Sequence, residues 1–465
     1  MRIACDMRLE RHTPWPRAVW CRALLSLALL AGAAHAAAES TDLALGSKTP
    51  YAAPSARLQP APAGFQPVAV LLVARHGSRG LTKPGPDDAA LALWHEAEAA
   101  GALTPAGRQF GADLQALMAA QRRLGYGQLS ALGQREHREL ARRLVARLPA
   151  LFAAGPRVEL RSSGVERAVD SAAGFAASLR EQAPQARLPD AVQVDRFLLY
   201  FHRLSISRDG AAAITPEQQA TLQRSLDYQH WLKSPVLARR LQRVDADPRL
   251  PPTAQALLRR LYAPAFVDGL ARRGEALAAA QALVDLRGAA ADLALELGAE
   301  RTQHLLKLVP LAQARVFAER DDAEDFYRKG PGVLEDGTAS YGMAQPLLDD
   351  LLARLPEGEG VALRFAHAEI VAPLVSLIGV AGVHQPQPEG QPYGYAVNPW
   401  RSAAVIPMAA NVQWEVWRDA DGQRWARLLL NEGEVDLKPA CDGARRQPGS
   451  HFYRVAGVLA CYRSR

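Results

Sequence analysis

Short apolar runs separated by longer amphipathic stretches predict alternating strands and helices along the chain. Val68–Ala74 is a continuous apolar run, short enough for a strand that is buried on both faces. Val158–Leu160 and Val361–Ala366 are two further strand candidates. Near the end, Val412–Val416 alternates apolar and polar positions, and a turn at Asp421-Gly422 leads into a second extended run, so we expect a hairpin there.

Helical spacing marks the stretches between these strands. Residues 86–124 have a mostly helical pattern, and Gln134–Leu148 carries leucines at helical spacing on one face. A further helix follows the second strand and runs through Leu179. From about residue 210 to 325 the chain is dominated by Ala, Leu, Arg and Gln, and Thr215 followed by proline is typical of a helix start.

These elements predict an α/β fold: a central, mostly parallel sheet flanked by helices on both faces, with an inserted smaller helical domain. We assign residues 67–200 and 326–465 to the α/β core and residues 201–325 to the helical insertion. Residues 37–66 are rich in Ala, Pro and Ser and lack periodicity, so we expect a lead-in on the surface.

The first 36 residues have the pattern of an export signal. Several arginines precede a short apolar run, Ala23–Ala34, and Ala34-His35-Ala36 fits the small-x-small rule for cleavage. A membrane anchor is the alternative, but the apolar run is too short for one. We therefore expect a signal peptide over residues 1–36 and a periplasmic or secreted protein.

The composition is that of a globular protein. Hydrophobic residues make up 49% and charged residues 22% of the 465, which excludes a disordered or fibrous chain. The net charge is +7, and only six of the 55 basic residues are lysine. Arginine binds phosphate through paired hydrogen bonds, but a GC-rich coding sequence is the simpler explanation for its excess. Cleavage after Ala36 would leave a net charge of +4, which is no polybasic footprint, so we expect neither nucleic acid nor, after signal cleavage, a membrane as a partner.

Two cysteines, Cys441 and Cys461, follow the predicted cleavage site. An even number of cysteines in an exported protein favours a disulfide, which here would close a short C-terminal loop. In the chain-entropy account such a bond contributes about 3 kcal/mol. No CxxC motif or Cys/His cluster indicates zinc.

The motif Arg75-His76-Gly77-Ser78-Arg79 directly follows the first apolar run. Ligands of open α/β sheets bind just past the carboxyl ends of the strands, which is where this motif falls. Two guanidinium groups can hold a phosphoryl group while the imidazole attacks phosphorus. The alternative is a surface turn with incidental charges.

Two further motifs also follow predicted strands. Arg161–Arg167 comes after the second strand and opens a helix, so Arg167 would lie in the first helical turn. A cation is unfavourable at a helix N-terminus unless it binds an anion. Taken alone, however, Arg167 is expected to be a solvated surface residue. After the third strand come His367 and Glu369, and a carboxylic acid near a phosphate can protonate the leaving oxygen. A metal site is the alternative for His-x-Glu, but no third ligand is evident.

Taken together, Arg75–Arg79 and His367-Ala368-Glu369 resemble the histidine acid phosphatase family. The His-Ala-Glu form, in place of the more usual His-Asp, looks like the multiple inositol polyphosphate phosphatase branch. The resemblance covers roughly residues 68–440. Other segments similar to that branch are Gly127–Ser130 with Leu132-Gly133, Ser163–Phe175, Phe326–Gly332 and Leu429–Glu432.

The resemblance implies a role for each matching residue. His76 would be the nucleophile, passing through a phosphohistidine, and Glu369 would be the proton donor. The residues that bind the scissile phosphate would be Arg75, Arg79, Arg167 and His367. Because the arginines neutralise the phosphoryl oxygens, the chemistry needs no metal, and we expect no cofactor.

The chain departs from the family pattern after Arg79. The family places a proline two residues further on, whereas Gly80–Pro84 delays it to the fifth position. This loop should line the specificity side of the pocket, and its Lys83 would reach a second phosphate or remain solvated. Further candidates for a second phosphate are Arg203, Arg208, Arg328 and Lys329.

The predicted function is hydrolysis of phosphomonoesters, with inositol polyphosphates, especially phytate, as the small-molecule substrate. A broader acid or sugar-phosphate phosphatase is the first alternative. A phosphoglycerate mutase shares the Arg-His-Gly start, but export argues against it. An exported inositol-phosphate binding protein with a dead site is a further alternative, which the filled catalytic positions disfavour.

Overall fold

The computed structural model describes residues 43–210 and 213–463, and Ala44–Arg465 forms one unit of the chain. The predicted signal peptide, residues 1–36, lies outside the described residues. None of the helices in the described part is long and apolar enough to cross a membrane.

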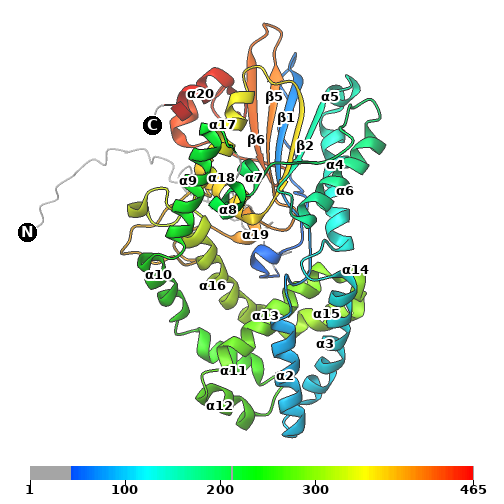
Figure 1. Cartoon of the computed structure of the whole chain (residues 1–465), viewed down its shortest axis with the longest axis vertical. Helices are drawn as coiled ribbons and strands as arrows, with labels where there is room; N and C mark the ends of the chain where they lie inside the picture. Colours follow the sequence, from blue (N-terminus) through cyan, green and yellow to red (C-terminus); the bar gives the residue numbers. More distant parts are fainter. Residues whose placement is uncertain (1–42, 211–212, 464–465) are drawn as a thin grey trace, which may run out of the picture. The chain divides into compact units, whose positions relative to one another are not determined.

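A mixed sheet forms the centre of the fold (Figure 1). Its described strands are β1 (Gln66–Arg75), β2 (Val158–Ser162), β3 (Gln193–Val194), β4 (Gly360–Ala366), β5 (Asn411–Arg418), β6 (Arg424–Leu430), β7 (Gly433–Glu434) and β8 (Tyr453–Arg454). In space they follow the order β3-β2-β4-β1-β5-β6-β7, with β8 paired to β6. The pairs among β1 to β4 are parallel, whereas β5 to β8 pair antiparallel. The predicted α/β sheet is confirmed, and β5 with β6 is the predicted hairpin.

The carboxyl ends of three parallel strands lie together at one edge of this sheet. Arg75 at the end of β1 pairs with Ala366 at the end of β4. Ser162 at the end of β2 pairs with Phe365 of β4. Since each predicted motif begins at or beside one of these strand ends, the register brings the three motifs to one place.

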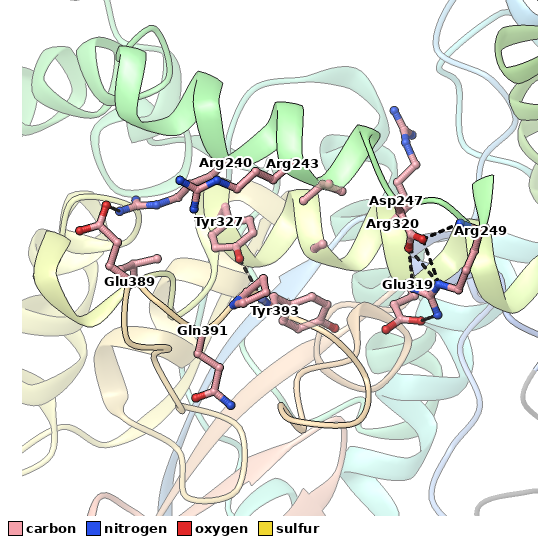
Figure 2. A pocket seen from close by; sticks show the side chains of 14 residues that line it. Arg240, Arg243, Asp247, Arg249, Glu319, Arg320, Tyr327, Glu389, Gln391 and Tyr393 are labelled. Atoms are coloured by element: carbon pink, nitrogen blue, oxygen red, sulfur yellow. Dashed lines mark hydrogen bonds and ion pairs between the residues drawn. The ribbon is translucent and has the colours of Figure 1, made fainter. Parts of the chain in front are cut away.

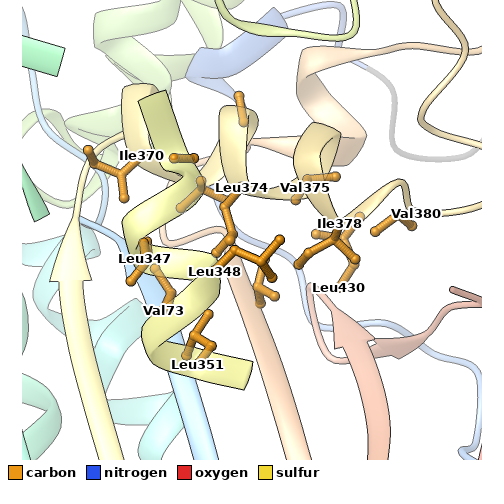
Figure 3. Packing of buried hydrophobic residues seen from close by; sticks show 14 of the residues in the cluster. Val73, Leu347, Leu348, Leu351, Ile370, Leu374, Val375, Ile378, Val380 and Leu430 are labelled. Carbon is orange, nitrogen blue, oxygen red and sulfur yellow. The ribbon is translucent and has the colours of Figure 1, made fainter. Parts of the chain in front are cut away.

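Helices cover both faces of the sheet (Figure 1). They are α4 (Ala131–Arg147), α5 (Pro149–Ala153) and α6 (Glu166–Gln182) on one face, and α17 (Gln345–Arg354) and α18 (Ala368–Ile378) on the other. Val70 and Leu72 of β1 pack against α4 and α6, whereas Val73 packs against α17 and α18 (Figure 3). β1 is therefore buried on both faces, as its continuous apolar run predicted. Each such side chain contributes about 1.5–3 kcal/mol when fully buried.

The second group of buried side chains is helical and includes helices from two parts of the chain. Phe110 and Leu114, from the stretch predicted helical at 86–124, pack with Leu286 and Phe317. The helices of this group are α2 (Pro86–Ala99), α3 (Pro105–Leu124), α11 (Leu250–Leu258), α12 (Pro264–Arg272), α13 (Ala276–Asp292), α14 (Ala294–Leu297), α15 (Ala299–Leu308) and α16 (Leu311–Lys329). The boundaries 201–325 of the helical insertion stay a prediction, and α2 and α3 pack with that stretch.

The remaining helices are short or pack beside the sheet. Thr215 caps α9 through a capping box, which confirms the predicted helix start. These helices are α7 (Arg196–Leu199), α8 (Ile206–Asp209), α9 (Pro216–Trp231), α10 (Pro235–Asp245), α19 (Ser402–Val405) and α20 (Val455–Arg463). The 3₁₀ turns are η1 (Gly46–Lys48), η2 (Phe201–Arg203), η3 (Leu334–Asp336), η4 (Gly342–Ala344) and η5 (Pro439–Ala444).

A disulfide joins Cys441 of η5 to Cys461 of α20, with their Cα atoms 5.3 Å apart. Both cysteines are buried in the core cluster that also contains the sheet. The predicted bond is confirmed, and it ties the C-terminal helix to the segment that follows the hairpin.

Candidate active site

The three motifs meet at a cavity of about 680 Å³ beyond the strand ends. The His76 amide donates to the Ala366 carbonyl at 2.9 Å, and the Ser163 amide donates to Phe365 at 3.0 Å, so the strand ladder continues into the motifs. All seven predicted substrate-site residues line this one cavity: Arg75, His76, Arg79, Lys83, Arg167, His367 and Glu369.

The His76 ring is buried and held by the backbone of the residue that follows it. Its Nδ1 lies 2.9 Å from the Gly77 carbonyl oxygen, which can only accept, so Nδ1 carries the proton. The lone pair is therefore on Nε2. Burial and the positive charges of Arg75 and Arg79 lower the pKa of His76 well below its usual value. A neutral imidazole with a free Nε2 is the form that acts as a nucleophile.

Close packing beneath His76 requires the glycine that follows it. A Cβ on Gly77 would lie 2.4 Å from the carbonyl oxygen of Gly133, in α4. The Gly77 amide also donates to Ser171 Oγ at 3.1 Å, in α6. Two helices on one face of the sheet therefore fix the turn on which the nucleophile lies.

Three guanidinium groups surround the same space. Arg75 Nη1 donates to the Ser47 carbonyl at 2.6 Å, and Arg79 Nη1 donates to the Gly80 carbonyl at 2.8 Å. Arg167 lies in the first turn of α6, as predicted. Burial and the other two arginines lower the pKa of Arg79 to about 10. Since such a cluster is unfavourable without a counter-charge, the cavity has the electrostatics of a site for a multiply charged anion.

His367 is the N-cap residue of α18, and its ring lies 5.5 Å from that of His76, centre to centre. Arg167 Nη2 donates to His367 Nδ1 at 3.4 Å, and a guanidinium group can only donate, so Nδ1 carries the lone pair. The ring proton is therefore on Nε2, which donates to Ser163 Oγ at 2.9 Å; the same oxygen accepts from the Val165 amide.

Glu369 lies in the first turn of α18, and 39% of its side chain is exposed. Lys329, the last residue of α16, places Nζ 3.6 Å from Glu369 Oε1. Partial burial by itself would raise the pKa of Glu369, but Lys329 and His202 outweigh it and hold the pKa well below its usual value. The carboxyl group is therefore ionised in the empty site.

The structure separates the predicted second-phosphate residues into two sets. Arg203 and Lys329 line the 680 Å³ cavity itself. Arg208 and Arg328 line an adjoining cavity of about 760 Å³ and not the first, whereas Arg203, Lys329 and Glu369 line both. Among the described residues, no group of three or more His, Cys, Asp or Glu side chains is placed to hold a metal ion.

Sequence reasoning missed several residues of the site. Ser47 and Lys48 come from η1, in the lead-in that had no periodic pattern. Tyr200 directly follows α7 and His202 lies in η2, and their rings lie 5.7 and 5.9 Å from the His367 ring. The arginine and histidine motifs carried a signal because they follow strands, whereas these residues do not.

A smaller cavity of about 210 Å³ lies between α10, α16 and the segment Glu389–Tyr393 (Figure 2). Its arginines are largely paired: Arg249 contacts Asp247 at 2.6 Å and Glu319 at 2.8 Å. None of the predicted site residues lines it.

Comparison with known proteins shows the family. Residues 68–247 and 285–431 match the family described as histidine phosphatase superfamily (branch 2), and the chain belongs to that family. The family resemblance seen in the sequence is confirmed. The chain is 24% identical to multiple inositol polyphosphate phosphatase 1 of Gallus gallus over 315 residues, which is 65% of this chain and 63% of that protein.

Solved structures match a larger share of the chain. The structure of multiple inositol polyphosphate phosphatase from Bifidobacterium longum in complex with inositol hexasulfate is 27% identical, with a TM-score of 0.78, and covers 90% of this chain and 97% of that chain. The same protein in complex with phosphate matches equally well. The phytase from D. castellii is 14% identical with a TM-score of 0.60, covering 90% of this chain and 84% of that one, and shares the fold.

Proposed function

We propose that the chain is an exported phosphomonoesterase that hydrolyses inositol polyphosphates, with phytate as a substrate, through a covalent phosphohistidine. The observation that carries the proposal is the neutral His76, with Nε2 free, inside a cavity formed with Arg75, Arg79 and Arg167. The relatives support the substrate class, because one is crystallised with inositol hexasulfate and with phosphate. The six sulfate esters carry the negative charge that phytate would bring.

In the first step, His76 Nε2 attacks phosphorus and the ester P–O bond breaks. The leaving inositol oxygen takes a proton from Glu369, which becomes a carboxylate. In the second step, Glu369 accepts a proton from water as the oxygen attacks phosphorus, and the N–P bond breaks to release phosphate. The nucleophile and the donor are thus restored at the end of each turnover.

The charge of the phosphoryl group is neutralised by the protein itself in this mechanism. The three guanidinium groups act as donors to the non-bridging oxygens, whose charge changes as the reaction proceeds, and His367 joins them through Nδ1 when the negative charge of the phosphate favours its protonated form. Phosphate binding also brings negative charge next to Glu369 and raises its pKa, which favours the protonated form that the first step needs.

The test is release of phosphate from phytate by the purified protein, compared with sugar phosphates and p-nitrophenyl phosphate. We expect turnover of phytate with a higher kcat/KM than of sugar phosphates. Higher kcat/KM on sugar phosphates would instead assign a broader phosphatase. Binding of phytate with no turnover of any ester would assign a binding protein.

A further inference from the structure

The lead-in before β1 forms one wall of the candidate active site. Its η1 turn carries Ser47, whose carbonyl accepts from Arg75, and Lys48, whose side chain lines the cavity beside His76 and Arg79. The Tyr51 amide, three residues on, donates to a buried glutamate of α4 and fixes the segment further. This segment lies before residue 68, where the family match begins.

Lys48 is held by a carboxylate from a distant part of the chain. Its Nζ lies 3.6 Å from Oδ2 of Asp292, the last residue of α13, and 3.5 Å from the Gly80 carbonyl oxygen. The Asp292 side chain is fully buried, which raises its pKa to about 6, and Lys48 opposes that rise more than Ser78, Arg79 or Arg75 does. A buried carboxylate in this state is costly unless a cation stays next to it, so Asp292 keeps the ammonium group of Lys48 in place.

Lysine at this position is not explained by composition. Only six of the 55 basic residues of the chain are lysine, yet Lys48, Lys83 and Lys329 all line this cavity. Lys329 is engaged by Asp325 at 2.7 Å, whereas the contacts of Lys48 are 3.5 Å and longer. An ammonium group has three donors, so Lys48 has capacity for a further acceptor.

We infer that Lys48 binds a phosphate group next to the scissile one in a polyphosphorylated substrate, with Asp292 as its positioning residue. The inference rests on the proposed function. Arg75, Arg79 and Arg167 already supply donors to a single phosphoryl group. Lys48 reaches the cavity from the side of Arg79, and it also lines an adjoining cavity of about 230 Å³ together with Lys83.

The charges around Lys48 support a role in binding an anion. Burial and the guanidinium of Arg79 lower the pKa of Lys48, whereas Asp292 opposes them. The groups that face it are Arg75, Arg79, Asp285 and Asp292. A substrate phosphate would add a negative charge and stabilise the protonated lysine.

The first experiment compares Lys48→Met with the wild type on phytate and on p-nitrophenyl phosphate, which has no second phosphate. Loss of one charge-assisted contact should raise KM for phytate by about tenfold or more. We expect KM and kcat for the aryl ester to stay within about twofold. The matched control is Lys307→Met, at an exposed lysine of α15, which should change neither substrate. Equal losses on both substrates would overturn the inference.

The single variant leaves Asp292 buried without its cation, which can disturb the fold. The double variant Lys48→Met/Asp292→Asn removes both charges, and its melting temperature reports whether the fold is kept. We expect the double variant to retain the high KM for phytate. A return of KM to the wild-type value would show that the unpaired carboxylate, and not the loss of a phosphate contact, caused the defect.

Asp292→Asn tests the positioning role through pH. Asp292 favours the protonated form of Lys48, so Lys48 should lose its proton at a lower pH in this variant than in the wild type. The rise of KM for phytate with pH should therefore also begin at a lower pH. KM for p-nitrophenyl phosphate should keep the wild-type pH profile. An unchanged profile on phytate would remove Asp292 from this role.

A binding measurement separates this inference from the proposed function. In a His76→Ala background, calorimetry with phytate measures affinity without turnover. Adding Lys48→Met should weaken the binding of phytate about tenfold or more, whether or not the wild type hydrolyses phytate. Equal affinity of the two proteins would overturn the role of Lys48 even if phytate proves to be a substrate.

Discussion

Lys329 Nζ lies 3.6 Å from Glu369 Oε1 and 2.7 Å from Asp325 Oδ1. The lysine ends α16 and the glutamate begins α18, so two helices meet at the carboxyl group that we propose as the proton donor. The contact stabilises the ionised form of Glu369, which cannot donate. Lys329 therefore sets the pH range over which the donor is protonated.

Replacing Lys329 by methionine should move the alkaline limb of the kcat profile to higher pH. Activity falls as pH rises through the pKa of the donor in the enzyme–substrate complex. Lys329 lowers that pKa, so its removal raises the pKa, and Asp325, left without its cation, acts in the same direction. An opposite charge at this distance shifts a carboxyl group by about 1–3 units.

The measurement is kcat against pH at saturating phytate. Lys329→Arg keeps the charge and should retain the wild-type limb. A limb that stays in place, or moves to lower pH, in Lys329→Met would show that Lys329 does not control the donor.

Glu369→Gln should slow the hydrolysis of phytate far more than that of p-nitrophenyl phosphate. Glutamine keeps the size and polarity of the side chain but supplies no acidic proton. General acid catalysis contributes about 10²–10⁴ in rate, and an inositol oxygen needs the proton much more than a nitrophenolate does. Phosphoenzyme formation must be followed in a single turnover, since breakdown of phosphohistidine is common to both substrates. Equal losses in that step would leave the donor unidentified.

The strand ends were the part of the site that the sequence could predict. A continuous apolar run such as Val68–Ala74 marks a buried strand, and a parallel sheet aligns the carboxyl ends of its strands. Arg75, Arg167 and Glu369 are separated widely in sequence, yet each follows a segment that was predicted to be a strand. Their convergence therefore needed only local pattern and a general property of the fold.

The contacts that depend on packing between distant segments could not be predicted. Lys48 and Asp292 are far apart in the chain, and neither belongs to a motif. The lead-in has no periodicity, so nothing in its pattern indicated that η1 would line the cavity. The packing of α2 and α3 with the later helices could not be predicted either, because the pattern of an amphipathic helix does not indicate which surface the helix covers.

The Cys441–Cys461 disulfide should be formed in the purified, unreduced protein and should stabilise it. We expect no free thiol when the denatured, unreduced protein is titrated. The double variant Cys441→Ser/Cys461→Ser should lose about 3 kcal/mol in the free energy of unfolding, measured with denaturant, because the bond closes a loop between residues 20 positions apart. Reduced wild type is the control and should show a similar loss. Two titratable thiols in the unreduced protein would contradict the bond.

Chelation should leave the rate unchanged. In the proposed mechanism the guanidinium groups of Arg75, Arg79 and Arg167 carry the phosphoryl charge that a divalent ion would otherwise hold. The assay uses p-nitrophenyl phosphate with excess EDTA, because phytate itself binds cations. Loss of activity that a divalent ion restores would replace this account with a metal-assisted one.

His76→Ala should abolish turnover while leaving phytate binding largely intact. The substitution removes Nε2, the attacking atom, but keeps the three arginines that supply the electrostatic part of binding. Loss of the nucleophile of a covalent mechanism should lower kcat by several orders of magnitude. The variant should keep its fold, because the His76 side chain makes only one hydrogen bond among the described residues, to the carbonyl of Gly77.

The intermediate itself distinguishes this mechanism from direct attack by water. Wild type quenched within one turnover of ³²P-labelled phytate should carry a label that is stable in alkali and lost in acid, as a phosphoramidate bond requires. His76→Ala should carry no label. Calorimetry should nevertheless show that this variant binds phytate, with a dissociation constant close to the wild-type value, which is measured by competition with inositol hexasulfate. Glu369→Gln serves as the internal comparison. This variant retains the attacking His76 Nε2, so it should still form the label, only more slowly. Label that persists in His76→Ala would mean that another side chain attacks phosphorus. A wild type that turns over phytate and never carries label under these conditions would mean that Nε2 activates water instead, with the arginines in the same role.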